Sequence, residues 1–270
     1  MKRIDLATLV GLLLAIGGIL VGNYLEGGKV SSILQPTAAL IVFGGTLGAV
    51  FVTYPMPILA RGLKAAIQVI GNRSTDARGL LDEIVRYAQK ARKEGIISLE
   101  GEAQKASDPF LKRAILMAVD GVDSKTMHET LELELQEMDE QGDLSAKVYE
   151  AAGGYAPTIG ILGAVLGLIH FMQNLSDVAK VGEGIAVAFV ATIYGVGSAN
   201  IVFLPAGGKL KVKHRADMVL REMMMHGAIA IQEGQNPKLI EEKLSAFIHE
   251  KQKAAEPAQA AKKAAPRAAA

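Results

Sequence analysis

The sequence contains no cysteine and no tryptophan among its 270 residues. Without cysteine the chain can form no disulfide, no cysteine-based zinc site and no thiol nucleophile. Without tryptophan, an aromatic belt at a membrane interface would have to rely on the six tyrosines. Basic and acidic residues nearly balance, with a net charge of only +1. We therefore expect no nucleic-acid partner, because no overall positive field draws the chain toward phosphates.

Recognisable catalytic motifs are also missing. The sequence has no P-loop, no paired-histidine metal motif and no nucleophile elbow. His214 and His226 lie on one expected helix but are twelve positions apart, which is not a spacing of metal ligands. The glycine pairs 17–18 and 44–45 fall inside apolar runs, where a phosphate-binding loop has no place. The sequence predicts that the protein is not an enzyme and has no cofactor or metal.

Long apolar runs are abundant instead. Residues 6–25 form an uncharged run of 20 residues, and residues 36–54 lie within a second uncharged stretch. The runs 155–175 and 184–206 contain no Asp, Glu, Lys or Arg. A helix needs roughly 20 apolar residues to cross a hydrocarbon core of about 30 Å. We therefore predict four transmembrane helices, the first of them a retained helix that is too long for a signal peptide.

Charged residues alternate with apolar residues at helical spacing between positions 61 and 154. Asp108 and Pro109 predict the start of a helix that runs to about Val119, because aspartate caps a helix and proline suits its first position. A second helix is predicted over 125–141, with one apolar face formed by Met127, Leu131, Leu135 and Met138. No segment has a strand pattern. The predicted fold class is all-α, a polytopic membrane protein with four transmembrane helices and a helical cytoplasmic domain.

We expect five parts along the chain. Residues 1–55 hold the first two transmembrane helices, and residues 56–154 form the cytoplasmic helical domain. Residues 155–206 hold the third and fourth transmembrane helices, and residues 207–250 form C-terminal cytoplasmic helices. The tail 251–270 consists mainly of alanine, lysine and proline without apolar periodicity, so we expect it to be disordered.

The distribution of basic residues predicts the orientation. Of 29 lysines and arginines, 13 lie between positions 61 and 154 and 12 lie after position 206. The two short links on the other side of the membrane carry only Lys29 and Lys180. Because cytoplasmic loops are enriched in basic residues, both termini and the large middle segment are expected in the cytoplasm.

Small residues four positions apart in the spans would allow helices to pack closely. The pairs are Gly18/Gly22, Gly44/Gly48, Gly160/Ala164, Gly163/Gly167 and Gly195/Ala199. They would serve either contacts among the four helices of one chain or contacts between subunits. Their presence on several faces of the third and fourth spans favours an oligomer.

Polar residues inside the spans are candidates for function. The hydroxyls of Thr46, Thr158 and Thr192 could equally bond to the backbone of their own helices. No span contains a carboxylate, so a protein that moved protons would need its titrating carboxylate from a partner. In the middle segment, Arg92 and Glu100 would form either an ordinary solvated surface or a contact with a charged partner.

In order, spacing and topology the chain resembles the MotA family of flagellar motor stator subunits, within the wider group of TolQ and ExbB, from roughly residue 6 to residue 248. The motifs that carry the resemblance are GGTLGA at 44–49, ARKEGIISLE at 91–100, YAPTIGILGAVLGL at 155–168 and AFVATIYGVGSAN at 188–200. The resemblance implies a multi-pass protein of the bacterial inner membrane. It also implies a homopentameric ring around the transmembrane helices of a MotB dimer, with ions passing to a MotB aspartate.

The family's functional residues map onto named positions of this chain. Its two important prolines, which belong to the ion pathway and torque coupling, correspond to Pro157 and Pro205. Its cytoplasmic arginine and glutamate correspond to Arg92 and Glu100, which the resemblance implies face the rotor switch protein FliG. Its channel threonine corresponds to Thr192.

Ion selectivity is predicted from Ala164. Sodium-driven members of the family tend to carry a threonine seven residues after the first proline, where this chain has Ala164. The resemblance therefore favours protons as the translocated ion, with sodium as the alternative.

Two other functions stay open at this point. One is a TolQ- or ExbB-like proton channel subunit that energises transport across the outer membrane, and the other is a non-conducting membrane scaffold. Relatives of the first kind usually have three spans and a different loop order, whereas this sequence predicts four spans.

Overall fold

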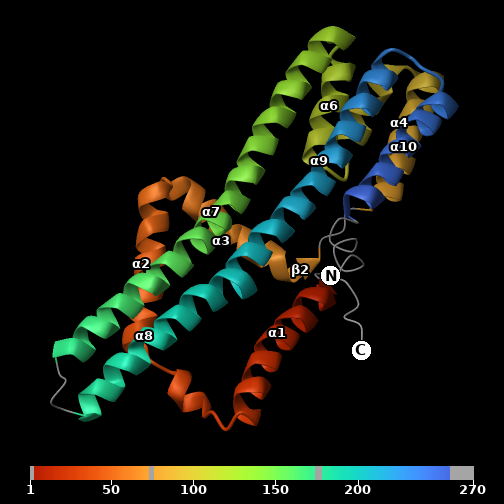
Figure 1. The fold of residues 1–270 in the computed structure, drawn as a ribbon. Coiled ribbons are helices and arrows are strands. Elements are labelled where there is room, and N and C mark those ends of the chain that lie inside the picture. The colour runs from red at the N-terminus through yellow and green to blue at the C-terminus, as the bar shows by residue number, and fades with distance from the viewer. Residues whose placement is uncertain (1–2, 73–75, 174–177, 256–270) are drawn as a thin grey trace. The chain divides into compact units, whose positions relative to one another are not determined.

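The structure, a computed structural model, describes residues 3–72, 76–173 and 178–255 (Figure 1). The chain is helical almost throughout, which confirms the all-α prediction. It divides into two compact units. Unit 1 comprises residues 1–73 and 143–211, and unit 2 comprises residues 74–142 and 212–270.

Four helices are long and apolar enough to cross a membrane, which confirms the predicted number of spans. The first two are α1 (Leu6–Leu25) and α2 (Pro36–Thr53), joined by the short 3-10 helix η1 (Val30–Ile33). The third is the second half of α7 (Ser124–Gln173). The fourth begins at Gly184 within α8 (Val178–Ser198) and continues through the π-helical turn η3 (Ala199–Phe203) into α9 (Leu204–Gln232).

Capping residues explain where these helices begin. The side chain of Asp5 accepts the N–H groups of Ala7 and Thr8 at the start of α1, and Pro36 occupies the first turn of α2. Directly after α2, Pro55 begins α3 (Met56–Ile70). Two strands of two residues each, β1 (Arg3–Ile4) and β2 (Gly71–Asn72), pair antiparallel. They were not predicted, because two residues are too short to show alternation.

Unit 2 has its own hydrophobic core. Its elements are α4 (Ala77–Glu94), η2 (Ile96–Leu99), α5 (Glu100–Ala103), α6 (Pro109–Val119), α10 (Pro237–Ala255) and the portions of α7 and α9 that belong to this unit. The backbone N–H of Phe110 donates to the Asp108 carboxylate over 2.8 Å, as the predicted start of α6 requires. The predicted apolar face of α7 is also confirmed, since Met127, Leu131 and Leu135 are buried in the core and Met138 packs against it.

Helix α7 is longer than predicted. The sequence predicted a helix that ends at residue 141 and a separate span from residue 155, but α7 is one helix of 50 residues with Pro157 inside it. Gly153 and Gly154 do not adopt positive φ, so they do not end the helix. A proline removes one N–H and leaves most of the helical hydrogen bonds in place, and packing against neighbouring helices can compensate for that loss.

Helix α10 also extends past the expected end at residue 250. Residues 251–255, predicted as the beginning of the disordered tail, continue this helix. Lysine, glutamine and alanine are good helix formers, so these residues can prolong a helix that packing has already formed. The rest of the predicted tail, residues 256–270, lies outside the described residues.

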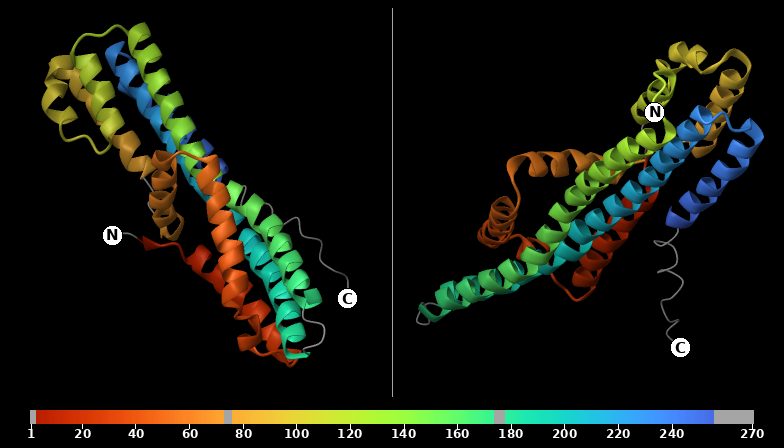
Figure 2. Two further views of the ribbon diagram at one scale, coloured as in Figure 1. Left: turned by 90° about the vertical axis from the view of Figure 1, so that its left-hand side faces the viewer. Right: turned by 90° about the horizontal axis from the view of Figure 1, so that it is seen from above.

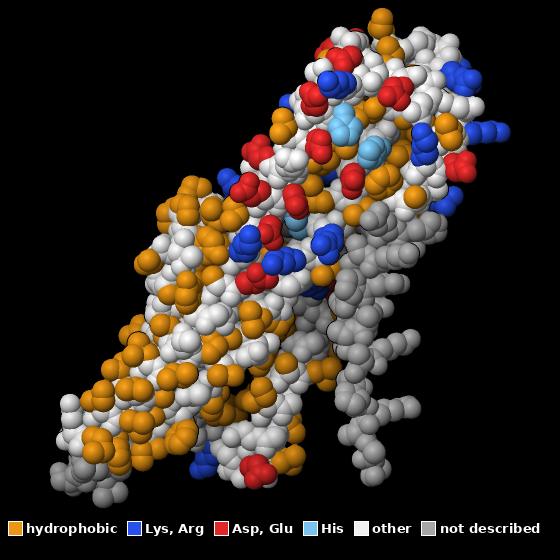
Figure 3. All heavy atoms as spheres, turned by 45° about the horizontal axis from the view of Figure 1, so that its top comes forward, with side chains coloured by type: hydrophobic (Ala, Val, Ile, Leu, Met, Phe, Trp, Pro, Cys, Tyr) orange, Lys and Arg blue, Asp and Glu red, His pale blue; other side chains and the backbone are white. Residues whose placement is uncertain are grey.

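The surfaces of the two units differ in chemistry. In Figure 3 hydrophobic side chains gather over the membrane helices of unit 1, whereas acidic and basic side chains gather over unit 2. Exposed side chains on the spans include Leu14, Leu40 and Phe189, each more than two-thirds exposed. Such a contiguous apolar surface is typical of a membrane protein.

Candidate functional site

A seam of small residues joins α7 to α8, which run side by side through the spans (Figure 2). The seam consists of Ala156, Gly160, Gly163 and Gly167 on α7 and Gly184, Ala188, Ala191 and Gly195 on α8. A Cβ added at Gly160 would come within 2.9 Å of the carbonyl oxygen of Ala191. One added at Gly195 would come within 2.5 Å of the carbonyl oxygen of Ala156. The two backbones are therefore in direct contact, which only very small side chains permit.

The predicted small-residue pairs divide into two groups. Gly160, Gly163, Gly167 and Gly195 belong to the seam inside this chain. By contrast, a Cβ at Gly18, Gly22, Gly44 or Gly48 would meet no atom within 4 Å. Close packing within one chain thus accounts for Gly160, Gly163, Gly167 and Gly195 but not for the predicted pairs of α1 and α2.

Helix α2 packs on one side of the α7–α8 pair. Its Ala38 and Val42 form a buried cluster with Val190 and Ala191 of α8. The hydroxyl of Tyr194 donates to the carbonyl oxygen of Ile33 over 2.6 Å, which connects α8 to the end of η1. Three of the four spans are therefore held together by small and aliphatic side chains and by one hydrogen bond from a partly buried tyrosine.

The opposite side of the α7–α8 pair carries three of the predicted site residues. At 100° per residue, Pro157 and Ala164 share one face of α7, turned away from its contacts with α2, and Thr192 lies on the corresponding face of α8. All three are half-buried. Around them lie exposed apolar side chains, among which Ile161 is 59% exposed and Phe189 is 70% exposed. We name this surface, between Pro157, Ala164 and Thr192, the open face.

Hydroxyl groups in the spans mostly bond to their own helices. Thr192 donates to the carbonyl oxygen of Ala188 over 3.2 Å, and Thr158 donates to that of Tyr155 over 2.8 Å. Thr46 is the exception, because it is completely buried and its hydroxyl has no partner among the described residues. The structure thus supports the simpler interpretation of the threonines as bonded core hydroxyls, with Thr46 left unexplained.

Pro157 and Pro205 lie at the same end of the helix pair. Gly153, one turn before Pro157, is so close to Leu204 that a Cβ there would meet the Leu204 side chain at 2.6 Å. Leu204 directly precedes Pro205, and the π-helical turn η3 ends at Phe203. Pro205 is exposed and lacks an N–H, so the fourth span has two irregularities that only Leu204 separates. Such sites are where helices bend.

Two ion pairs in unit 1 lie near these prolines, and the sequence reasoning missed both. The ammonium of Lys209 pairs with the carboxylate of Asp5, at the start of α1. That of Lys211 pairs with Glu150 of α7 over 2.9 Å. The only sequence signal was the position of these charges at the edges of apolar runs. The partners themselves are far apart in the chain, so pattern analysis could not pair them.

Arg92 and Glu100 lie on either side of a tight turn in unit 2. Arg92 is in the last turn of α4, Gly95 ends that helix with φ of +85°, and Glu100 begins α5. Both charged side chains are exposed, and neither has an ion-pair partner among the described residues. The turn is held by the ion pair of Lys90 with Glu102 at 3.0 Å. The hydrogen bond from Lys90 lowers the pKa of the Glu102 carboxyl.

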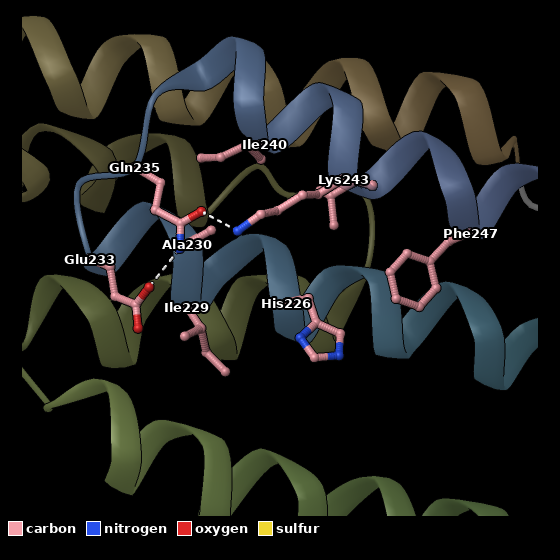
Figure 4. A pocket seen from close by; sticks show the side chains of 9 residues that line it. His226, Ile229, Ala230, Glu233, Gln235, Ile240, Lys243 and Phe247 are labelled. Carbon is pink, nitrogen blue, oxygen red and sulfur yellow. Dashed lines mark hydrogen bonds between the residues drawn. The ribbon is translucent and has the colours of Figure 1, made fainter.

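Figure 4 shows a pocket of about 400 Å³ between α9 and α10 of unit 2. Gln235 accepts from the Lys243 ammonium over 3.1 Å and donates to the Glu233 carboxylate over 2.7 Å. These polar groups satisfy one another rather than converging on a ligand position. Within the described residues there is no group of three His, Asp or Glu side chains that could hold a metal ion.

Two protein-family models match this sequence, one in its N-terminal part and one in its C-terminal part. The family model of the motility protein A N-terminal region matches residues 9–95, and that of the MotA/TolQ/ExbB proton channel family matches residues 102–223. Motility protein A of Bacillus subtilis is 34% identical over 250 residues, which cover 90% of this chain and 91% of the relative.

Solved structures show the same fold. A structure of C. jejuni MotAB superposes with a TM-score of 0.85 at 30% identity, covering 90% of this chain and 95% of that chain. The flagellar MotAB stator complex from Bacillus subtilis superposes with a TM-score of 0.81 at 33% identity, covering 89% and 95%. The match over about nine-tenths of the chain shows that this chain belongs to the motility protein A family of flagellar stator subunits.

Proposed function

We propose that this chain, a stator subunit of the bacterial flagellar motor in the inner membrane, conducts protons with a MotB-like partner and turns their flow into torque on the rotor. The observation that carries the proposal is the open face. It is a long apolar surface on the two most closely packed spans, with Thr192 half-buried on it and no carboxylate in either apolar run.

The open face lacks a carboxylate, and this absence indicates what a partner would have to supply. A proton pathway of this kind uses a carboxylate that gains and loses a charge, and the apolar runs of this chain contain no carboxylate. A helix of a MotB-like dimer that lies against the open face would supply that carboxylate and would cover the exposed apolar side chains. The superposed relatives are MotAB complexes, which supports such a partner. A ring of five copies around the dimer would present one open face per copy.

Protonation would change which helix packing is favoured. Burying a carboxylate between helices costs much free energy when it is charged and unpaired, and little when it is neutral. Each proton that binds and leaves would thus alter the contact between the partner helix and the open face. Pro157 and Pro205, together with the π-helical turn before Pro205, provide the places where α7 and the fourth span can bend in response.

Arg92 and Glu100 would transmit the force to the rotor. Their opposite charges are exposed on a turn that the Lys90–Glu102 ion pair holds in shape. Complementary charges on the switch protein FliG would set the register of contact with the rotor. This role requires both termini and the segment between the second and third spans in the cytoplasm, as the distribution of basic residues predicts.

Complementation tests this function. The chain and its MotB-like partner are expressed in a non-motile strain that lacks its own stator, and swimming speed is measured. We expect swimming that persists without sodium and stops with a protonophore. Normal membrane levels of both proteins without swimming would favour a non-conducting scaffold, and dependence on sodium would refute the assignment of the ion.

A further inference from the structure

The side chain of Lys209 connects the start of the first span to the helix that follows the fourth span. Its ammonium pairs with the Asp5 carboxylate and donates to the Thr8 hydroxyl. Asp5 also caps α1 by accepting the N–H groups of residues 7 and 8. Both charged side chains are largely covered, with 23% of Lys209 and 19% of Asp5 exposed. We name this contact the α1–α9 ion pair.

Helix α1 is loosely packed. None of its residues is fully buried, although it lies against η1, α3 and η3. The two-residue bridge between β1 and β2 attaches the segment before α1 to the segment after α3. The α1–α9 ion pair adds a charged contact between the start of the first span and the helix that continues the fourth span.

Lys209 occupies a mechanically sensitive position. It lies one helical turn after Pro205, which follows the π-helical turn η3, and α9 then continues without a break to Gln232. A bend at Pro205 would therefore move every residue of α9 that follows unless something restrains the helix. The charges of a largely covered ion pair are screened less than those of an exposed pair, so this pair can restrain the two helices more than a surface pair would.

We propose that the α1–α9 ion pair is a positioning contact for torque generation: it holds the start of α9 to the first span, so that bending at Pro205 moves the helix about a fixed point. The proposal rests on the proposed stator function. In this proposal Asp5 and Lys209 position helices and do not bind the translocated ion. Loss of the pair would leave membrane insertion intact but would let the start of α9 follow the bend, and part of the motion would be lost before it reached the rotor.

Single variants, tested for swimming in the complemented strain, distinguish the effect of the ion pair's charge from the effect of the Asp5 helix cap. Asp5→Asn removes the charge but keeps a side chain that caps well. We expect Asp5→Asn and Lys209→Gln to lose most of the swimming speed at unchanged membrane levels, whereas Lys209→Arg swims like the parent chain. Lys238→Gln, which removes an exposed lysine at the start of α10, serves as the matched control for loss of one positive charge and should swim normally.

A double variant that exchanges the two charges tests whether the ion pair itself is needed for swimming. Asp5→Lys alone loses both the cap and the pair, while Asp5→Lys combined with Lys209→Asp loses the cap but restores a pair of reversed polarity. We expect the double variant to swim clearly faster than Asp5→Lys. Equal speeds of the two, or normal swimming of Lys209→Gln, would overturn the proposal. Failure of the parent chain itself to restore swimming would instead refute the proposed function.

Discussion

Gly195 of α8 contacts the backbone of Ala156 on α7, so closely that an added Cβ would approach the Ala156 carbonyl oxygen to 2.5 Å. The two helix backbones are similarly close at the other end of the seam. There, a Cβ added at Gly184 would lie 2.9 Å from the Gly167 carbonyl oxygen. The hydrophobic effect does not draw helices together inside lipid, so this contact of backbones is a main source of their association.

We predict that Gly195→Ala destabilises the membrane unit. The added methyl group would meet backbone atoms that cannot move aside, and such overpacking typically costs about 1–3 kcal/mol. The thermal unfolding midpoint of the purified protein in detergent should fall. Gly197→Ala is the matched control, because a Cβ there meets nothing within 4 Å. If both variants melted at the same temperature, the seam would not be closely packed.

Pro157→Ala should abolish swimming without loss of the protein from the membrane. Alanine would restore an N–H to the middle of α7 and favour a straight, stiff helix at the place where we propose that it bends. Swimming in soft agar and an immunoblot of the membrane fraction measure the two effects. Pro57→Ala provides the control, because Pro57 is an exposed residue in the first turn of α3, where proline is easily replaced. Normal swimming of the Pro157 variant would exclude the proposed hinge.

Charge reversal at Arg92 or at Glu100 should impair swimming more than reversal of Lys112. Arg92 and Glu100 are exposed, so reversal should leave the fold of unit 2 intact and change only its contact with a charged partner. Swimming speed and thermal stability should be measured on the same variants. Equal losses of speed in all three would show that Arg92 and Glu100 are ordinary surface charges.

Glu102 should stabilise the protein in a pH-dependent way. Its pKa is lowered in the folded state, chiefly by the hydrogen bond from Lys90, so its contribution is present above the unfolded pKa of about 4.3 and is lost as the pH falls through the folded pKa. Glu102→Gln should therefore lower the unfolding midpoint at pH 7, and the difference from the parent chain should shrink in acid. A difference independent of pH would mean that the carboxylate charge is not what matters.

Local patterns were sufficient to predict much of the fold. An apolar run long enough to span a bilayer can satisfy its backbone only as a helix, so the four spans followed from length and composition. The start of α6 at Pro109 followed from Asp108, because a cap acts on the residues next to it. The residues of the α7–α8 seam could be recognised as small, but not matched to one another, since spacing along one helix says nothing of its partner.

The remaining features depend on contacts between distant residues. Whether α7 ends before Pro157 depends on what packs around it, and the structure shows one helix of 50 residues. The open face exists because α2 covers only the other side of the α7–α8 pair. The pairing of Asp5 with Lys209 requires the folded chain to bring its first span against the helix that follows its fourth. Helical periodicity is a local property, so it can be predicted from the sequence. Which helices pack against one another depends on the folding of the whole chain.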